Sequence, residues 1–117
     1  TDLLLMRAEA LAETNTNLSV AINDVNAILT RAFGNVSQNL TTTAGPAAIL
    51  NAARLERRIE TPMEGDRVQQ LKRIGAKGEP NIRIRLAPWN CNGLALQFPA
   101  SESTIKGFQM NPEGGCN

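Results

Sequence analysis

The chain of 117 residues contains no histidine, which removes the usual general base of enzymes and the commonest metal ligand. It contains no tyrosine either, and its aromatic residues amount to 3%. Aliphatic side chains must therefore supply nearly all the packing of one modest core. Two cysteines are too few for a four-ligand zinc site. Since the sequence also lacks a phosphate-binding glycine loop and a Ser/His/Asp set, we expect no enzyme, no cofactor and no bound metal.

Long apolar runs are also missing, and none approaches the ~20 residues that a membrane-spanning helix requires. The chain starts in a helical pattern without an initiator methionine, so we expect the remainder of the same protein upstream. The net charge of +1 indicates no class of partner. Residues 54–85 hold nine Lys/Arg against five Asp/Glu, a local +4. Such a segment can bind phosphates, but solvated or internally paired charges are the preferred interpretation, and no nucleic-acid partner is predicted.

Hydrophobic periodicity predicts about four helices, of which the first two cover residues 2–13 and 18–33. Because only four residues connect them, they form an antiparallel helical hairpin over residues 1–33. The first helix has two apolar faces, which predicts neighbours on two sides. These faces consist of Leu4, Leu5, Ala8, Leu11 and Ala12, and of Leu3, Met6 and Ala10. The second helix has a single apolar stripe, and Gly34 ends it.

A second helical pair is predicted over residues 46–75. Pro46 suits the first turn of a helix that runs to about residue 60, and Pro62 prevents its continuation. A shorter fourth helix then ends at Gly75. From residue 76 to 117, glycine, proline and asparagine recur too often for a helix, so we expect a long, mostly irregular tail that wraps over the helices. Residues 82–86 alternate in polarity and can form a short strand or extended edge.

Charged residues cluster in and after the third helix. A helical wheel places Ala48, Ala52, Leu55 and Ile59 on its core face, with two glutamates at the border of that face. Carboxylates beside a core need cationic partners, and Arg67 or Arg73 of the fourth helix can provide them. The sequence therefore predicts an ion-pair network between these helices, made of Glu56, Arg57, Glu60, Glu64, Arg67 and Arg73.

An alternative role for Glu56, Glu60 and Glu64 is acid–base catalysis of glycoside hydrolysis. That chemistry needs two carboxyl groups beside a cleft, one of them with a raised pKa. The arginines around these glutamates are expected to lower their pKa values, which would impair a general acid. The structural interpretation is therefore preferred, and no catalytic residue is predicted.

Two further features lie in the predicted tail. A disulfide between Cys91 and Cys116 would close a loop of about 25 residues and contribute ~3 kcal/mol. Such a bond would indicate an oxidising compartment, whereas two unpaired thiols remain the alternative. Trp89 is the one large stacking surface for a sugar ring, although a single tryptophan is more often a packing residue.

The order of these pieces resembles the C-terminal region of SusD/RagB proteins over nearly the whole chain. The most specific matches are Glu56-Arg57-Arg58, Glu64-Gly65-x-Arg67 and Leu71-Lys72-Arg73-Ile74-Gly75. Further matches are Leu3-Leu4-Leu5-Met6-Arg7-Ala8-Glu9-Ala10, Ala21-Ile22-Asn23-Asp24-Val25-Asn26-Ala27-Ile28, Phe98-Pro99-Ala100-Ser101-Glu102 and Gln109-Met110-Asn111-Pro112. Val68 and Gln70 depart from the pattern, which usually has an aromatic and an acidic residue at these positions.

The resemblance implies a largely helical protein with TPR-like hairpins. It also implies a surface-exposed lipoprotein of the bacterial outer membrane, anchored upstream of these residues. Such a protein captures a glycan or other nutrient and works with a TonB-dependent transporter of the SusC type. A generic TPR-like protein–protein interaction module is the alternative, and a clear repeat of ~34 residues would favour it.

Overall fold

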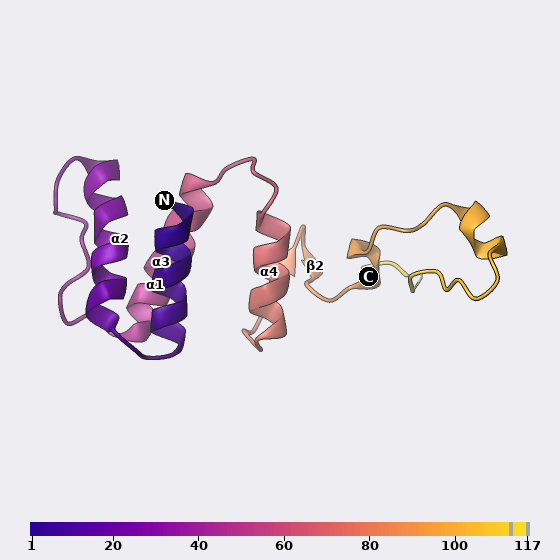
Figure 1. The fold of residues 1–117 in the computed structure, drawn as a ribbon, viewed down its shortest axis with the longest axis horizontal. Coiled ribbons are helices and arrows are strands. Elements are labelled where there is room, and N and C mark those ends of the chain that lie inside the picture. The colour runs from indigo at the N-terminus through magenta and orange to yellow at the C-terminus, as the bar shows by residue number, and fades with distance from the viewer. Residues whose placement is uncertain (113, 117) are drawn as a thin grey trace. The chain divides into compact units, whose positions relative to one another are not determined.

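The computed structural model describes residues 1–112 and 114–116, so the predicted tail is described except at positions 113 and 117. Within these residues the protein is mainly helical, with four α-helices and two very short strands. The chain divides into two compact units, which we call the N-terminal unit (Thr1–Glu64) and the C-terminal unit (Gly65–Asn117). Helices α1, α2 and α3 belong to the first unit and α4 to the second (Figure 1). The predicted fold class, helices followed by a mostly irregular tail, is confirmed.

The N-terminal unit contains α1 (Asp2–Glu13), α2 (Leu18–Phe33) and α3 (Pro46–Glu60). Helix α1 packs against both α2 and α3, and α2 also contacts α3, so the three helices enclose one core. The core is aliphatic, as the shortage of aromatic residues requires. Its buried members are Leu5, Ala8, Ala12, Ala21, Ile22, Val25, Ile28, Leu29, Ile49 and Ala53.

The connection between α2 and α3 is held to α2 by side-chain hydrogen bonds. Asn26 donates to the Leu40 carbonyl at 3.0 Å and accepts from the Leu40 amide at 2.7 Å. Its side chain thus imitates a second backbone strand. Thr30 and Asn39 form a further hydrogen-bonded pair. Gly34 ends α2 in the left-handed conformation that the sequence predicts.

The buried face of α3 differs from the predicted one. Ile49 and Ala53 are at most 1% exposed, whereas Leu55 and Ile59 are 53% and 57% exposed. The helix carries two apolar stripes, and the stripe containing Ile49 and Ala53 faces α1 and α2. The assignment of Leu55 and Ile59 to the core face was therefore wrong.

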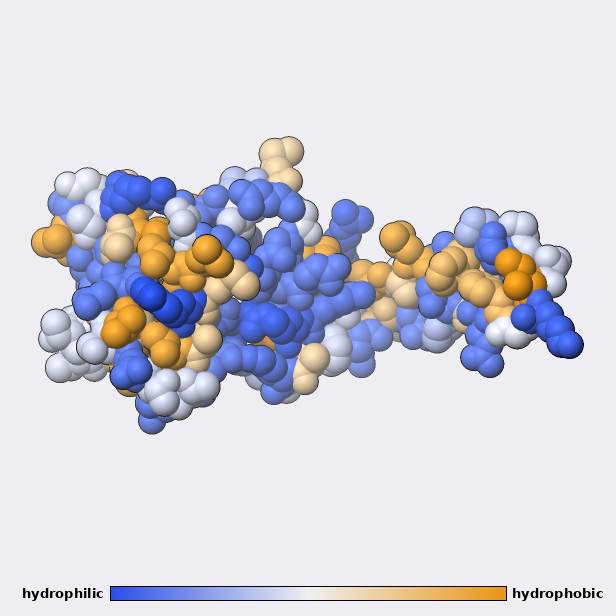
Figure 2. Space-filling model, in the orientation of Figure 1, coloured by the Kyte–Doolittle hydropathy of each residue, from blue (hydrophilic) through white to orange (hydrophobic). Residues whose placement is uncertain are grey.

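Helix α1 also leaves one of its two predicted apolar faces at the surface. Leu3 is 81% exposed and Met6 is 44% exposed. Figure 2 shows apolar residues at the surface of the N-terminal unit. Among the residues with coordinates, no helix is both long enough and apolar enough to cross a membrane.

The C-terminal unit begins with α4 (Arg67–Ala76), against which a small hairpin packs. Strands β1 (Arg83–Ile84) and β2 (Ala87–Pro88) are antiparallel, and Ile84 is opposite Ala87. These two side chains are buried, as are Ile74 and Gly75 of α4. The predicted extended segment over residues 82–86 therefore reverses direction at its end instead of continuing as one strand.

The remaining tail is mostly irregular, with single 3-10 turns at η1 (Asn92–Leu94) and η2 (Ala100–Thr104). A disulfide joins Cys91 to Cys116. Between these cysteines the two arms of the loop contact each other through side chains. The contacts are Asn111 to the Leu96 carbonyl, Gln97 to the Pro112 carbonyl, and an edge-to-face pair of Phe98 and Phe108. Leu96 is nevertheless 92% exposed, so this part of the tail does not bury all its apolar residues.

Candidate functional site

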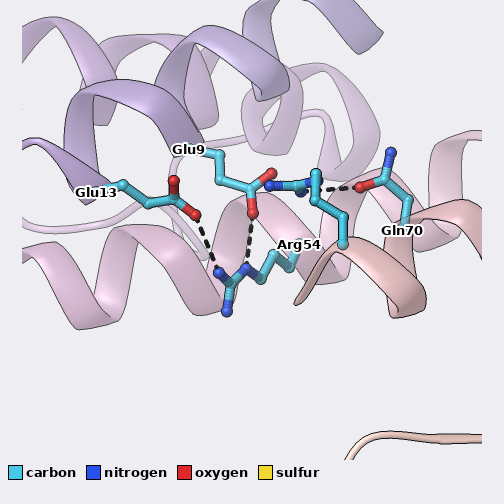
Figure 3. A network of polar contacts seen from close by, with 5 residues as sticks. Glu9, Glu13, Arg54 and Gln70 are labelled. Atoms are coloured by element: carbon cyan, nitrogen blue, oxygen red, sulfur yellow. Dashed lines mark hydrogen bonds and ion pairs between the residues drawn. The ribbon is translucent and has the colours of Figure 1, made fainter. Parts of the chain in front are cut away.

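Helices α1 and α3 are joined by one arginine that serves two glutamates. Arg54 donates from Nε to Glu9 at 2.8 Å, and its Nη2 lies 3.3 Å from a Glu13 oxygen. Figure 3 shows both glutamates pointing from α1 toward this guanidinium. The Glu9 side chain is only 6% exposed and that of Arg54 is 20% exposed, so the pair is largely removed from water. A buried charge pair of this kind fixes helix geometry, because removing either partner strands the other.

Helices α1 and α2 are joined by a two-pronged ion pair. Arg7 donates from Nε and Nη2 to the two oxygens of Asp24, both at 2.7 Å. The side chain of Asp24 is 7% exposed, whereas that of Arg7 is 57% exposed. The hydrogen bond and the charge of Asp24 raise the pKa of Arg7. The sequence places Asp24 opposite the apolar stripe, and only its position one helical turn from Ala21 and Ile28 could have suggested burial.

A third group of charges lies where α1 begins and where α2 and α3 end. Arg57 of α3 pairs with Asp2 of α1: its Nε lies 2.7 Å from Oδ1, and its Nη2 donates a hydrogen bond to Oδ2 at 3.3 Å. Arg31 of α2 pairs with Glu60 of α3 and also donates to the Thr1 hydroxyl at 3.3 Å. These contacts close the end of the three-helix unit, and all of them join helices to one another.

Two of the six predicted network residues pair with other helices of the N-terminal unit. Glu60 pairs with Arg31 of α2, and Arg57 pairs with Asp2 of α1. Glu64 is exposed at the end of this unit. In the C-terminal unit Arg67 is the first residue of α4, and Arg73 donates to Gln70 at 2.9 Å. The predicted bridge from residues 56–64 to Arg67 and Arg73 stays a prediction.

Glu56 has a different environment from the other acidic residues of α3. It is 6% exposed on the buried face of the helix. Burial raises the pKa of its carboxyl group, and the nearby Glu60 carboxylate raises that pKa further. The expected lowering of this pKa by arginines was therefore wrong, because Arg54 and Arg57 point toward carboxylates of α1. A carboxyl so deeply covered offers no surface to a sugar chain, so the raised pKa does not make it a general acid.

Trp89 lies directly after β2 and packs against α4. A Cβ atom added to Gly75 would lie 2.3 to 2.5 Å from three atoms of the indole ring. The ring therefore rests on the bare backbone of Gly75, and the side chain is half-buried. This contact explains why the motif over residues 71–75 ends in glycine. One part of the indole thus has a packing role, and its role in ligand binding stays a proposal.

The disulfide between Cys91 and Cys116 closes the loop formed by the C-terminal tail. Gly93 lies so close to it that an added Cβ would be 2.8 Å from the Cys116 sulfur. The absence of a side chain at residue 93 thus lets the two arms meet at Cys91 and Cys116. Among the residues placed in the structure, no group of three or more His, Cys, Asp or Glu side chains is arranged to hold a metal ion.

Comparison with known proteins gives one finding about the family. The SusD family matches residues 1–115. No curated protein and no solved structure matches the chain. The match spans both units and includes α4 with Gly75, the hairpin and the irregular tail. The chain therefore belongs to the SusD family.

Proposed function

We propose that this chain is the scaffold portion of a cell-surface protein that binds a glycan or other nutrient. In this proposal the protein is an outer-membrane lipoprotein that works with a SusC-like, TonB-dependent transporter. The observation that carries the proposal is the match to the SusD family over residues 1–115, because this is a family of binding proteins rather than enzymes.

The charges of the N-terminal unit support a scaffold role. Each ion pair joins two helices, and the acidic partners Glu9 and Asp24 are almost completely covered. Enzymes that cleave glycosidic bonds need carboxyl groups that a sugar can reach. These carboxylates instead fix the angles between helices, so that a binding surface elsewhere keeps its shape.

Trp89 is the proposed sugar contact of this chain. Its packing on Gly75 fixes the orientation of the ring, while the half-buried side chain keeps some surface for a ligand. A fixed aromatic ring loses little conformational entropy when a sugar stacks on it. Replacing Trp89 with leucine should weaken glycan binding in the full-length protein while the helices remain folded.

The test purifies the full-length protein from its own membrane and asks whether a SusC-like, TonB-dependent transporter accompanies it. Co-purification of the two, and calorimetric binding of an oligosaccharide without release of reducing ends, are the expected results. Release of new reducing ends by the pure protein would contradict the binding role. Failure to co-purify with the transporter would remove the proposed partnership.

A module that binds other proteins is the second candidate, and the exposed apolar stripe of α3 favours it. Leu55 and Ile59 lie one turn apart at the surface, as the apolar face of a helix that contacts a partner does. Glycan binding by the full-length protein would favour the first candidate. Binding of helical peptides that Leu55→Asp abolishes, without glycan binding, would favour the second.

A further inference from the structure

The turn between β1 and β2 holds two side chains in an unfavourable backbone conformation. Its two central residues, Arg85 and Leu86, have φ angles of +50° and +71°. Two-residue hairpin turns of this type normally contain Asn-Gly or Asp-Gly, because a side chain at positive φ crowds the backbone. This crowding destabilises the turn for every residue other than glycine. An Arg-Leu pair is therefore a poor choice for the stability of the hairpin.

Neighbouring contacts explain how the turn is tolerated. The guanidinium of Arg83 donates to the carbonyl oxygen of Leu86 at 2.8 Å and so closes the turn. Ile84 and Ala87, which are opposite each other, are 3% and 8% exposed. These contacts offset the cost of the turn. They do not require an arginine and a leucine at its centre, since Asn-Gly would form the same backbone with less strain.

The two side chains of the turn make no contribution to the core of the unit. Leu86 is 87% exposed, and Arg85 is also exposed. Strained residues that persist without a packing role are typical of sites that contact a ligand or a partner. The surrounding charge is positive, since residues 65–90 contain six Lys/Arg and two Asp/Glu. A partner that meets this tip would therefore gain from carboxylates beside an apolar hollow.

We propose that the tip of the β1–β2 hairpin is a docking element for another protein. Leu86 is its apolar anchor, and Arg85 is the cation that pairs with carboxylates at the rim of the partner's hollow. A convex tip suits insertion into a protein pocket, whereas sugar-binding sites are concave surfaces. This inference rests on the proposed function, in which the partner is the transporter.

The experiment replaces both residues with the pair that the turn prefers. The double variant Arg85→Asn/Leu86→Gly in the full-length protein should unfold at a higher temperature, because it removes the strain. Its affinity for the transporter, measured by titration of the detergent-purified proteins, should fall at least tenfold. The affinities of the wild type and of Leu86→Gly alone should also fall with rising salt, whereas that of the double variant should fall less steeply because it lacks the Arg85 charge.

A matched control changes the same chemistry elsewhere in the C-terminal unit. Leu96 is 92% exposed and Lys106 is exposed, so Leu96→Gly/Lys106→Asn should leave the affinity for the transporter unchanged. If the wild type does not bind the transporter, the proposed function fails. If the wild type binds and the Asn-Gly variant binds equally well, only the hairpin proposal fails. Loss of glycan binding with retention of the transporter would likewise overturn the proposal and make the tip a sugar contact.

Discussion

The two units of this chain are stabilised in different ways. The N-terminal unit carries five basic and seven acidic residues, and four of its five arginines pair with a carboxylate of another helix. The C-terminal unit carries seven basic and four acidic residues. Its described structural features include the packing of an indole ring on a glycine, a two-residue hairpin turn and a disulfide bond. The first unit is thus a helical core whose helices are fixed to one another by ion pairs, as a scaffold requires. The second unit instead fixes the orientation of side chains that remain partly or fully exposed.

The largest expected effect tests which face of α3 completes this helical core. Ile49→Ala should lower the free energy of unfolding by about 2–5 kcal/mol, because it leaves a cavity at a fully buried position. Leu55→Ala on the same helix should change it by less than ~0.5 kcal/mol, since that side chain is 53% exposed. Urea denaturation followed by circular dichroism measures both. Equal losses in the two variants would contradict the assigned face.

The next effect tests the ion pair between α1 and α3. Arg54→Ala should cost about 2–4 kcal/mol, because it leaves the buried Glu9 carboxylate without this guanidinium. Arg58→Ala is the matched control, since Arg58 is exposed on the same helix, and it should cost less than ~0.5 kcal/mol. Thermal unfolding at low and high salt distinguishes them. A loss for Arg54→Ala that disappears in high salt would show that the pair is not buried.

These contacts also show how far the sequence could predict the molecule. Periodicity and helix-ending residues predicted all four helices, with α1, α2 and α3 at the same bounds. The same periodicity could not choose between the two apolar stripes of α3, because Ile49 and Ala53 repeat as a helix face just as Leu55 and Ile59 do. The buried stripe packs against α1 and α2, and the ion pair on this side joins Arg54 to Glu9, 45 residues away in the chain. Local patterns contain no information about such distant partners.

The candidate site was harder to predict for a related reason. The sequence identified Trp89 as the one large aromatic side chain that a sugar could stack on. Its packing against Gly75, however, depends on a hairpin that brings the chain back to α4. The turn of that hairpin contains neither glycine nor asparagine, so no turn signal marked it. A sequence pattern that breaks a local rule can thus hide an element until the structure is known.

The third prediction tests the contact on which the second unit depends. Gly75→Ala should cost about 1–3 kcal/mol, because the new methyl group would overlap the indole of Trp89. Since Trp89 is the single tryptophan, its fluorescence should report the displacement directly. Gly78→Ala is not a suitable control because Gly78 has φ of +91°, so Ala76→Gly serves instead. In the double variant Gly75→Ala/Trp89→Leu, most of the loss should be recovered. No recovery would mean that Gly75 is needed for another reason.

The smallest expected effect is in the N-terminal unit and concerns Glu56, a buried carboxyl group whose environment disfavours its charged form. Burial and Glu60 raise the pKa of its carboxyl in the folded state, so folding favours the neutral form. The neutral Glu56 carboxyl therefore stabilises the fold at pH values below its unfolded-state pKa of 4.5. This contribution is lost as the pH rises through the pKa of the folded state. Glu56→Gln should thus stabilise the protein at pH 7, by less than ~1 kcal/mol, and the gain should vanish near pH 4.

Glu60→Gln, one turn away, should have the opposite sign at pH 7, because it removes the partner of Arg31. Thermal unfolding of both variants across this pH range compares the two carboxylates on one helix under identical conditions. Equal destabilisation by the two substitutions would mean that Glu56 is held as a charged brace like the others. Opposite signs would mean that α3 carries one carboxylate that fixes a helix and one that the fold merely tolerates.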